Sequence, residues 1–232
     1  MTSAKLEALA SRLDGALGPA VVARHIDRGE LTIELAADGM LAAMQTLKSD
    51  PSLAFTQLSD LSGVDYLTYG QADWQTRRAS SVGFSRGVAR NAIKAGEGET
   101  RRFAVTYQLL SIEHNMRLRV KVFPAGEPPR LSSVVELWAA ANWYEREAFD
   151  LFGILFDGHP DLRRILTDYG FIGHPFRKDF PLEGYVEVRY DPEKGRVVNQ
   201  PVSIEPRTLV PRVIREEDWV HSSKPVNEAS DA

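Results

Sequence analysis

Two adjacent runs of β-prone residues constrain the fold of this chain more than any other feature. They cover residues 103–112 and 116–123 and are joined by Glu113, His114 and Asn115. Basic and apolar side chains alternate along the second run, in the order Arg117, Leu118, Arg119, Val120, Lys121 and Val122. Because neighbouring side chains of a strand point to opposite faces of a sheet, this alternation predicts a hairpin with one buried and one solvent-exposed face. The chain must therefore supply a second layer over the buried face.

Periodic segments before the hairpin can form that layer. Leucines recur at helical spacing in the first segment, at Leu6, Leu9, Leu13 and Leu17. A strand pair is expected over residues 21–35, and Asp38 is placed to cap a second helix that ends before Pro51. Residues 53–61 have the pattern of a further strand. We therefore predict an α+β fold: a two-layer α/β domain with a mixed β-sheet and the element order α-β-β-α-β-β-β, followed by a charged helix-and-loop region and an extended tail.

The length of 232 residues suits one main domain with an appendage. We expect this domain to span residues 1–182. Residues 183–232 are interrupted by prolines and have few apolar periodicities, so they are predicted to be an extended tail that is either disordered or laid on a partner. Within the domain, residues 68–102 lose periodicity and carry seven basic against three acidic side chains. They are interpreted as an exposed basic insertion.

The composition excludes several functional classes. The sequence has no cysteine, so it can form neither a disulfide nor a thiolate site for zinc or an iron–sulfur cluster. Its formal net charge of −4 makes nucleic acid an unlikely partner. No apolar run is long enough to cross a membrane, and the first ten residues lack the apolar core of a signal peptide. These features favour a cytoplasmic protein.

A third helix is predicted to start at Ser133, which forms a capping-box pattern with Glu136, and to run to about Ala148. Glu145 falls on the apolar face of this helix. An unpaired buried carboxylate costs several kcal/mol, so Glu145 should have a cationic or hydrogen-bonded partner, and Arg163 or Arg164 is the candidate. On the outer face, Arg146 and Asp150 have the i,i+4 spacing of an ion pair.

The segment that follows, residues 151–182, carries paired charges on rigid turns. Its charged and histidine residues are His159, Asp161, Arg163, Arg164, His174, Arg177, Lys178 and Asp179. One interpretation is a metal site formed by His159, His174, Asp161 and Glu147, but no two histidines have the spacing of a helical zinc pair. The alternation of arginine with aspartate fits charged clusters that hold loops together and face another subunit better.

A serine hydrolase is an alternative from a different functional class. Gly83, Ser85 and Gly87 match the GxSxG pattern of a nucleophile elbow, with His159 or His174 as a possible base. That motif requires a buried strand before the serine, whereas the residues before Ser85 are polar. A stand-alone binding adaptor is a third possibility.

Three phrases resemble a known family. They are EREAFDLFG at 145–153, GHPDLRRIL at 158–166 and GHPFRKDFPL at 173–182. In this order they resemble the signature of the C subunit of respiratory complex I, and the predicted element order is similar to that family's amino-terminal domain. The long basic insertion and the residues at 167–170 depart from the family pattern, but neither departure alters the charged phrases.

The resemblance implies a cofactor-free structural subunit of the peripheral arm of the proton-translocating NADH:quinone oxidoreductase, which transfers electrons from NADH to a quinone such as ubiquinone. It implies docking on the D subunit, with the B and I subunits nearby, while FMN and the iron–sulfur clusters are held by partner subunits. The chain would lie on the cytoplasmic side of the bacterial inner membrane, as a peripheral part of a membrane complex in the respiratory chain. The equivalent subunit of a membrane-bound hydrogenase or formate hydrogenlyase is a related alternative.

On this view no residue of the chain is catalytic, cofactor-binding or metal-binding. Glu145 with Arg163 and Arg164 would form internal clamps, while Arg177, Lys178 and Asp179 would be outward docking charges.

Overall fold

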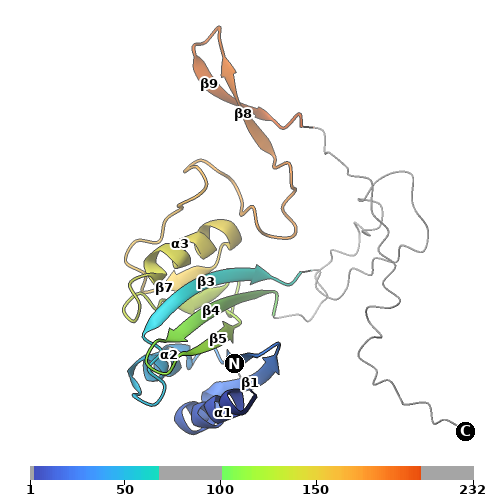
Figure 1. Cartoon of the computed structure of the whole chain (residues 1–232). Coiled ribbons are helices and arrows are strands. Elements are labelled where there is room, and N and C mark those ends of the chain that lie inside the picture. The colour runs from blue at the N-terminus through green and yellow to red at the C-terminus, as the bar shows by residue number, and fades with distance from the viewer. Residues whose placement is uncertain (1–2, 68–100, 205–232) are drawn as a thin grey trace, which may run out of the picture.

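A computed structural model describes residues 3–67 and 101–204 of the chain (Figure 1). The basic insertion predicted at 68–102 therefore lies outside the described residues, apart from Arg101 and Arg102. Ser85, the residue on which the hydrolase alternative depends, also lies outside them.

The main domain contains three α-helices and seven strands among the described residues, and a strand pair follows it. The bounds are α1 (Ser3–Leu17), a short 3-10 helix (Gly18–Ala20), β1 (Val21–Asp27), β2 (Glu30–Leu35), α2 (Met40–Ser49), β3 (Gln57–Asp65), β4 (Phe103–Ser111), β5 (Met116–Val122), β6 (Arg130–Ser132), α3 (Ala141–Phe152), β7 (Leu155–Asp157), β8 (Val186–Asp191) and β9 (Arg196–Pro201). From α1 to β5 this is the predicted order α-β-β-α-β-β-β.

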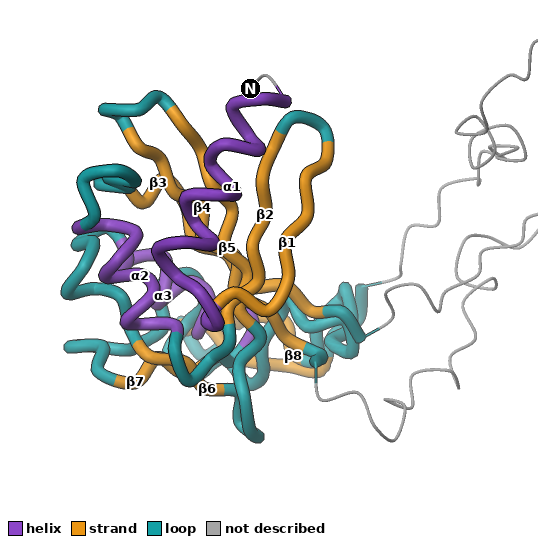
Figure 2. The backbone as a smooth tube through the Cα atoms, turned by 90° about the horizontal axis from the view of Figure 1, so that it is seen from below, coloured by secondary structure: helices purple, strands orange, loops and turns teal. Residues whose placement is uncertain are grey.

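Five strands form one mixed sheet in the order β1-β2-β5-β4-β3. All neighbours in it are antiparallel except β2 and β5, which run parallel, with Thr32 opposite Arg119. The predicted hairpin of β4 and β5 lies at the centre of the sheet, with Leu109 opposite Leu118. Figure 2 shows the five strands side by side, with α1 and α2 packed over them. The α+β prediction with a mixed sheet is confirmed.

One hydrophobic core joins the helices to the sheet. The leucines of α1 are buried in it, together with Leu118, Val120 and Val122 of β5. The intervening basic residues of β5 are exposed or half-buried, as the alternation predicts. Each fully buried leucine or valine stabilises the fold by roughly 1.5–3 kcal/mol relative to an exposed one. Burial of this one face therefore holds the two layers together.

The predicted bounds of three elements are wrong. Gly39, not Asp38, occupies the cap position of α2. The third strand begins at Gln57 rather than at residue 53, because the residues before it form a turn that buries Leu53 and Phe55. The third helix begins at Ala141 instead of Ser133 and ends at Phe152 rather than near Ala148. Its predicted capping box does not form, because the Ser133 hydroxyl bonds to the carboxylate of Glu145.

The predicted tail contains a hairpin. Strands β8 and β9 pair antiparallel with each other and with no other described strand, and they project away from the five-stranded sheet (Figure 1). Residues 183–204 are therefore not uniformly extended. Residues 205–232 lie outside the described part.

Gly63 of β3 leaves room for a side chain of α3. A Cβ atom added there would lie 2.5 Å from Cδ2 of Phe152, the last residue of α3. Gly63→Ala should therefore lower the free energy of unfolding by about 1–3 kcal/mol, since Phe152 has to move out of its packed position. Gly15→Ala is the matched control: no atom lies within 4 Å of the added Cβ, and a glycine replaced inside a helix should stabilise by about 0.5–1 kcal/mol. Chemical denaturation measures the free energy of unfolding of both variants. Equal changes in the two variants would contradict the proposed contact between residue 63 and Phe152.

Candidate functional site

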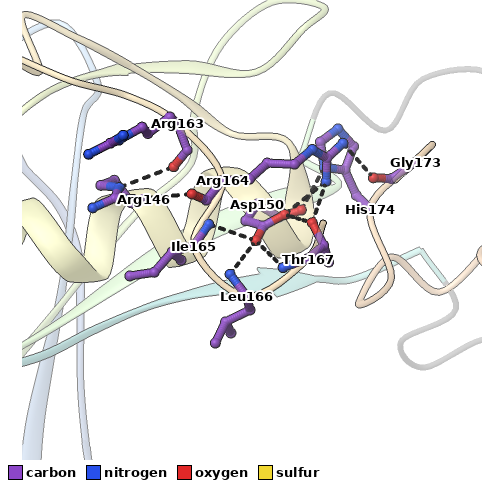
Figure 3. Close-up of polar contacts among 9 residues, drawn as sticks. All are labelled: Arg146, Asp150, Arg163, Arg164, Ile165, Leu166, Thr167, Gly173 and His174. Atoms are coloured by element: carbon purple, nitrogen blue, oxygen red, sulfur yellow. Dashed lines mark hydrogen bonds and ion pairs between the residues drawn. The ribbon is translucent and has the colours of Figure 1, made fainter. Parts of the chain in front are cut away.

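Asp150 anchors the loop that follows the helix α3 (Figure 3). Its side chain is fully buried. One carboxylate oxygen accepts the backbone N–H groups of Ile165, Leu166 and Thr167 at 3.1, 2.8 and 2.9 Å. The other accepts the Thr167 hydroxyl and an Nη of Arg164, which is 2.8 Å away. One carboxylate thus holds a whole turn of the loop.

These donors control the charge of Asp150. Burial opposes ionisation, but the Thr167 hydroxyl and the backbone N–H groups outweigh it and keep the pKa of Asp150 far below its usual value. Asp150 is therefore ionised throughout the neutral range. Arg164 neutralises this buried anion and also donates to the carbonyl of Gly173 at 3.0 Å, which ties two parts of the loop together.

Arg146 holds the same turn through different backbone groups. Its guanidinium donates to the carbonyls of Arg163 and Arg164, both at 3.1 Å, and lies over the ring of Trp143. The predicted ion pair of Arg146 with Asp150 is therefore wrong. The peptide chain offers carbonyls at 163–164 and N–H groups at 165–167, so a cation and an anion from one helix can each bind it.

Glu145 is buried as predicted, but neither predicted cation is its partner. Its carboxylate accepts the Ser133 hydroxyl at 2.6 Å and the Val134 N–H at 2.7 Å. Arg163 instead pairs with Asp161 at 2.8 Å in a largely exposed ion pair, and Arg164 pairs with Asp150. The prediction that Glu145 needs a hydrogen-bonded partner is confirmed, whereas the choice of Arg163 or Arg164 is wrong.

Residues of the third phrase, 173–182, bind the C-terminal end of α3. His174 Nδ1 lies 2.8 Å from the carbonyl oxygen of Asp150, and Arg177 Nε donates to the carbonyl of Phe152 at 2.7 Å. These are terminal carbonyls of a helix, which have no partner within the helix. Burial is the main cause that lowers the pKa of His174 below its usual value, with the charges of Arg177 and Arg164 acting in the same direction. These causes favour the neutral imidazole, although the bond to the Asp150 carbonyl acts in the opposite direction.

A second anchor connects the loop to the sheet. Asp65, at the end of β3, accepts an Nη of Arg102 at 2.8 Å and the backbone N–H of Lys178 at 2.9 Å. Arg102 also pairs with Asp179 at 2.9 Å. The Asp65 and Arg102 pair was not predicted, since the two residues are far apart in sequence. It places residues 177–179 against the ends of β3 and β4.

The loop exposes apolar side chains alongside charged ones. The apolar side chains at least half exposed are Leu166, Tyr169, Ile172, Phe176, Leu182 and Tyr185. The exposed charged side chains are Asp161, Arg163, Asp168, Lys178 and Asp179, whereas Arg177 is half-buried over the ring of Phe103. Residues 158–185, which we name the charge-locked loop, are thus attached to α3 through Arg164 and Arg177 while several of their apolar side chains are exposed. Sequence patterns did not indicate this apolar surface because its residues follow no helical or strand period.

The residues weighed as metal ligands are not gathered into a site. His159 contacts the carbonyl oxygen of Asn142 at 3.2 Å and the N–H of Asp161 at 3.0 Å. Glu147 is exposed on α3. In residues 3–67 and 101–204, no three histidine, aspartate or glutamate side chains are grouped so that they could hold a metal ion. Within the same ranges, no helix is long and apolar enough to span a membrane.

Comparison with known proteins identifies the family of the chain. Residues 33–186 match the family "Respiratory-chain NADH dehydrogenase, 30 Kd subunit". The C subunit of the NADH-quinone oxidoreductase of Hydrogenovibrio crunogenus is 58% identical over 211 residues, covering 89% of this chain and 94% of that protein. The C subunit of the same enzyme of Halorhodospira halophila is 54% identical over 228 residues, covering 93% of each chain.

Two solved structures are also similar. The trypsin-resistant fragment (1–134) of Nqo5 is 31% identical, with a TM-score of 0.49, and the match covers 66% of this chain and 98% of the fragment. A chain of the membrane-bound sulfane sulfur reductase, an archaeal respiratory membrane complex, is 20% identical with a TM-score of 0.53, over 77% of this chain and 86% of that one. The latter likeness concerns the fold alone.

The fold and the charge-locked loop define an α+β chain whose described part displays apolar side chains on a loop held rigid by buried charges. By its sequence, the chain belongs to the family of the C subunit of NADH:quinone oxidoreductase, the 30 kDa subunit of complex I. Members of this family are subunits of an enzyme complex of the respiratory chain, which confirms the assignment suggested by the three phrases.

Proposed function

We propose that this chain is a cofactor-free structural subunit in the peripheral arm of the proton-translocating NADH:quinone oxidoreductase. It docks on the D subunit, with the B and I subunits nearby, on the cytoplasmic side of the bacterial inner membrane. FMN and the iron–sulfur clusters belong to partner subunits, and the chain keeps their carriers in register for electron transfer from NADH to quinone. The observation that carries this proposal is the charge-locked loop, whose internal bonds keep apolar side chains at the surface.

The physical reason is that apolar side chains exposed to water cost free energy. Tyr169 and Ile172 are each 83% exposed. Contiguous exposed apolar patches on a soluble domain mark interaction sites, and aromatic residues are enriched at the centres of protein interfaces. A loop held by Asp150, Arg146 and Asp65 loses little further conformational freedom when it binds, which favours tight docking.

The β8–β9 hairpin supports the same proposal. Val186, Val188 and Tyr190 alternate along β8, and Tyr190 lies opposite Val197 of β9. All four side chains are more than half exposed. An isolated two-stranded hairpin is marginally stable in water, so this apolar face is expected to be covered by a partner in the assembled complex.

The cofactor-free role is supported by the side chains available. Clusters of iron and sulfur are held by cysteine thiolates, and this sequence contains none. Arg164 and Arg177 of the charge-locked loop bond to α3 and to the loop backbone, which is a positioning role.

Isolation of the native assembly tests the proposal. A tagged full chain is purified from detergent-solubilised membranes, and its partners are identified by mass spectrometry. The expected partners are the D, B and I subunits, together with iron–sulfur proteins and a flavoprotein. Recovery with a hydrogenase large subunit instead would assign the chain to the related hydrogenase module, and recovery of the chain alone would refute the docking role.

The exposed loop residues provide a sharper prediction. The double substitution Tyr169→Ser and Ile172→Ser should leave the free energy of unfolding of the chain within about 0.5 kcal/mol of wild type, because both side chains are exposed. Its recovery with partner subunits should nevertheless fall several-fold, because the docking surface loses apolar area. Ile112→Ser is the matched control, since Ile112 is 66% exposed but lies in the turn between β4 and β5. Equal recovery of both variants would contradict the location of the docking surface.

A further inference from the structure

Glu145 and its surroundings form a polar site inside the core that the docking role does not use. The side chain of Glu145 has no exposed surface. Its Oε2 contacts the Ser133 hydroxyl at 2.6 Å and its Oε1 accepts the Val134 N–H at 2.7 Å. Both partners are neutral, and none of the ion pairs in the described part of the chain includes Glu145. An anion here has two hydrogen bonds and no countercharge.

The groups that face Glu145 from the neighbouring elements do not supply a countercharge. Tyr107 of β4 is fully buried, and its hydroxyl is without a hydrogen-bond partner in the described part of the chain. Burial raises the pKa of the Tyr107 phenol well above its usual value, and the charge of Glu145 raises it further. On α3 itself, the adjacent Arg146 is bound to the backbone of the charge-locked loop, and Asp150 carries the same sign of charge.

The contacts of Glu145 suit a protonated carboxyl group as well as an ionised one. In the protonated form, Oε2–H donates to Ser133 Oγ, and Oε1 still accepts the Val134 N–H. In the ionised form, the proton has passed to solvent, and the Ser133 hydroxyl turns to donate to Oε2. Burial raises the pKa of Glu145 to about 7, although the bonds from Ser133 and Val134 lower it in part.

We propose that Glu145, Ser133 and Val134 form a proton-dependent latch, closed most firmly when Glu145 is protonated, which attaches residues 131–134 to α3. The attachment matters because Ser133 leads out of β6 and donates its N–H to the carbonyl of Asp157 of β7. The latch therefore joins the small β6–β7 sheet to the helix that carries Asp150. Loss of the proton leaves an unpaired anion in the core and loosens this junction.

The sign of the pH dependence follows from linkage. A carboxyl group protonated more readily in the folded than in the unfolded chain contributes stability that is complete below about pH 4.5 and is lost as the pH rises through about 7. The latch thus weakens toward alkaline pH. This is opposite to the behaviour of an ion-paired carboxylate such as Asp150.

The direct test is a titration of the full-length chain labelled with ¹³C at the glutamate side-chain carboxyl carbon. The Glu145 resonance is assigned by its absence in Glu145→Gln. We expect its midpoint near pH 7, well above the range around 4.3 of ordinary glutamates. A midpoint in that ordinary range would overturn the proposal, and the titration itself is made on the unsubstituted chain.

Two variants then test the latch. Glutamine reproduces the hydrogen bonds of the protonated acid but does not ionise. The difference in melting temperature between Glu145→Gln and wild type should therefore shift by several degrees in favour of the variant between about pH 5.5 and about pH 8.5. Glu147→Gln, the same change at an exposed position two residues away, should show no such trend. Ser133→Ala removes a donor to the anion and should move the Glu145 midpoint to higher pH. A constant difference for Glu145→Gln, or an unmoved midpoint in Ser133→Ala, would refute the latch.

Discussion

Asp150→Ala is expected to release the charge-locked loop from α3 and to lower the free energy of unfolding by about 3–5 kcal/mol. The change leaves Arg164, whose side chain is only 18% exposed, without its anion, and it removes the acceptor of three backbone N–H groups. Hydrogen exchange should show loss of protection at residues 165–167 and little change in β4 and β5. Trypsin should cleave near Arg163 and Arg164 much faster than in wild type.

The control for Asp150→Ala is Glu147→Ala. Glu147 is exposed on the same helix, so its removal should change stability by less than about 0.5 kcal/mol. Because the pKa of Asp150 is lowered in the folded chain, its contribution should be complete above the ordinary pKa of about 3.9 and be lost as the pH falls below it. Equal stability of the two variants at neutral pH would show that Asp150 does not anchor the loop.

Gly153→Ala should have the second large effect, a loss of about 2–4 kcal/mol. Gly153 ends α3 in the left-handed conformation, with φ of 74°, which costs a residue with a side chain roughly 1–2 kcal/mol. In addition, the new Cβ would lie 2.5 Å from an Nη of Arg177 and 2.6 Å from Nε2 of His174. Both side chains must move and give up their bonds to the end of the helix.

Gly158→Ala separates the cost of the left-handed conformation from the cost of the steric contact. Gly158 also has a positive φ, of 87°, but no atom lies within 4 Å of its added Cβ. It should therefore show only the conformational strain, a loss of about 1–2 kcal/mol. If denaturation midpoints of Gly153→Ala and Gly158→Ala coincide, then the contact with Arg177 and His174 contributes nothing to stability.

Much of the fold could be predicted from the sequence because local patterns carry it. The alternation along residues 116–122 and the leucines of α1 each report which side of an element is buried, and the structure buries those sides. The start of α3 could not be predicted in this way. Ser133 has the local features of a helix cap, but a carboxylate twelve residues later on the chain competes for its hydroxyl.

The candidate site was predicted in part. The three charged phrases indicate where the important residues are, and the structure brings most of them to one loop around the end of α3. Their pairing was not predictable from spacing alone. Arg146 and Asp150 have the separation of an ion pair, yet both bind the backbone at 163–167, which no helical spacing rule includes.

Taken alone, the sequence determined the class of fold, the order of its elements and the family, because burial patterns and residue phrases are properties of contiguous segments. The tertiary structure decided which charges face inward, which apolar side chains the loop displays, and that Glu145 has neutral partners. Those outcomes depend on backbone N–H and carbonyl groups that every sequence possesses. Only the folded chain brings particular ones within hydrogen-bonding distance of particular side chains.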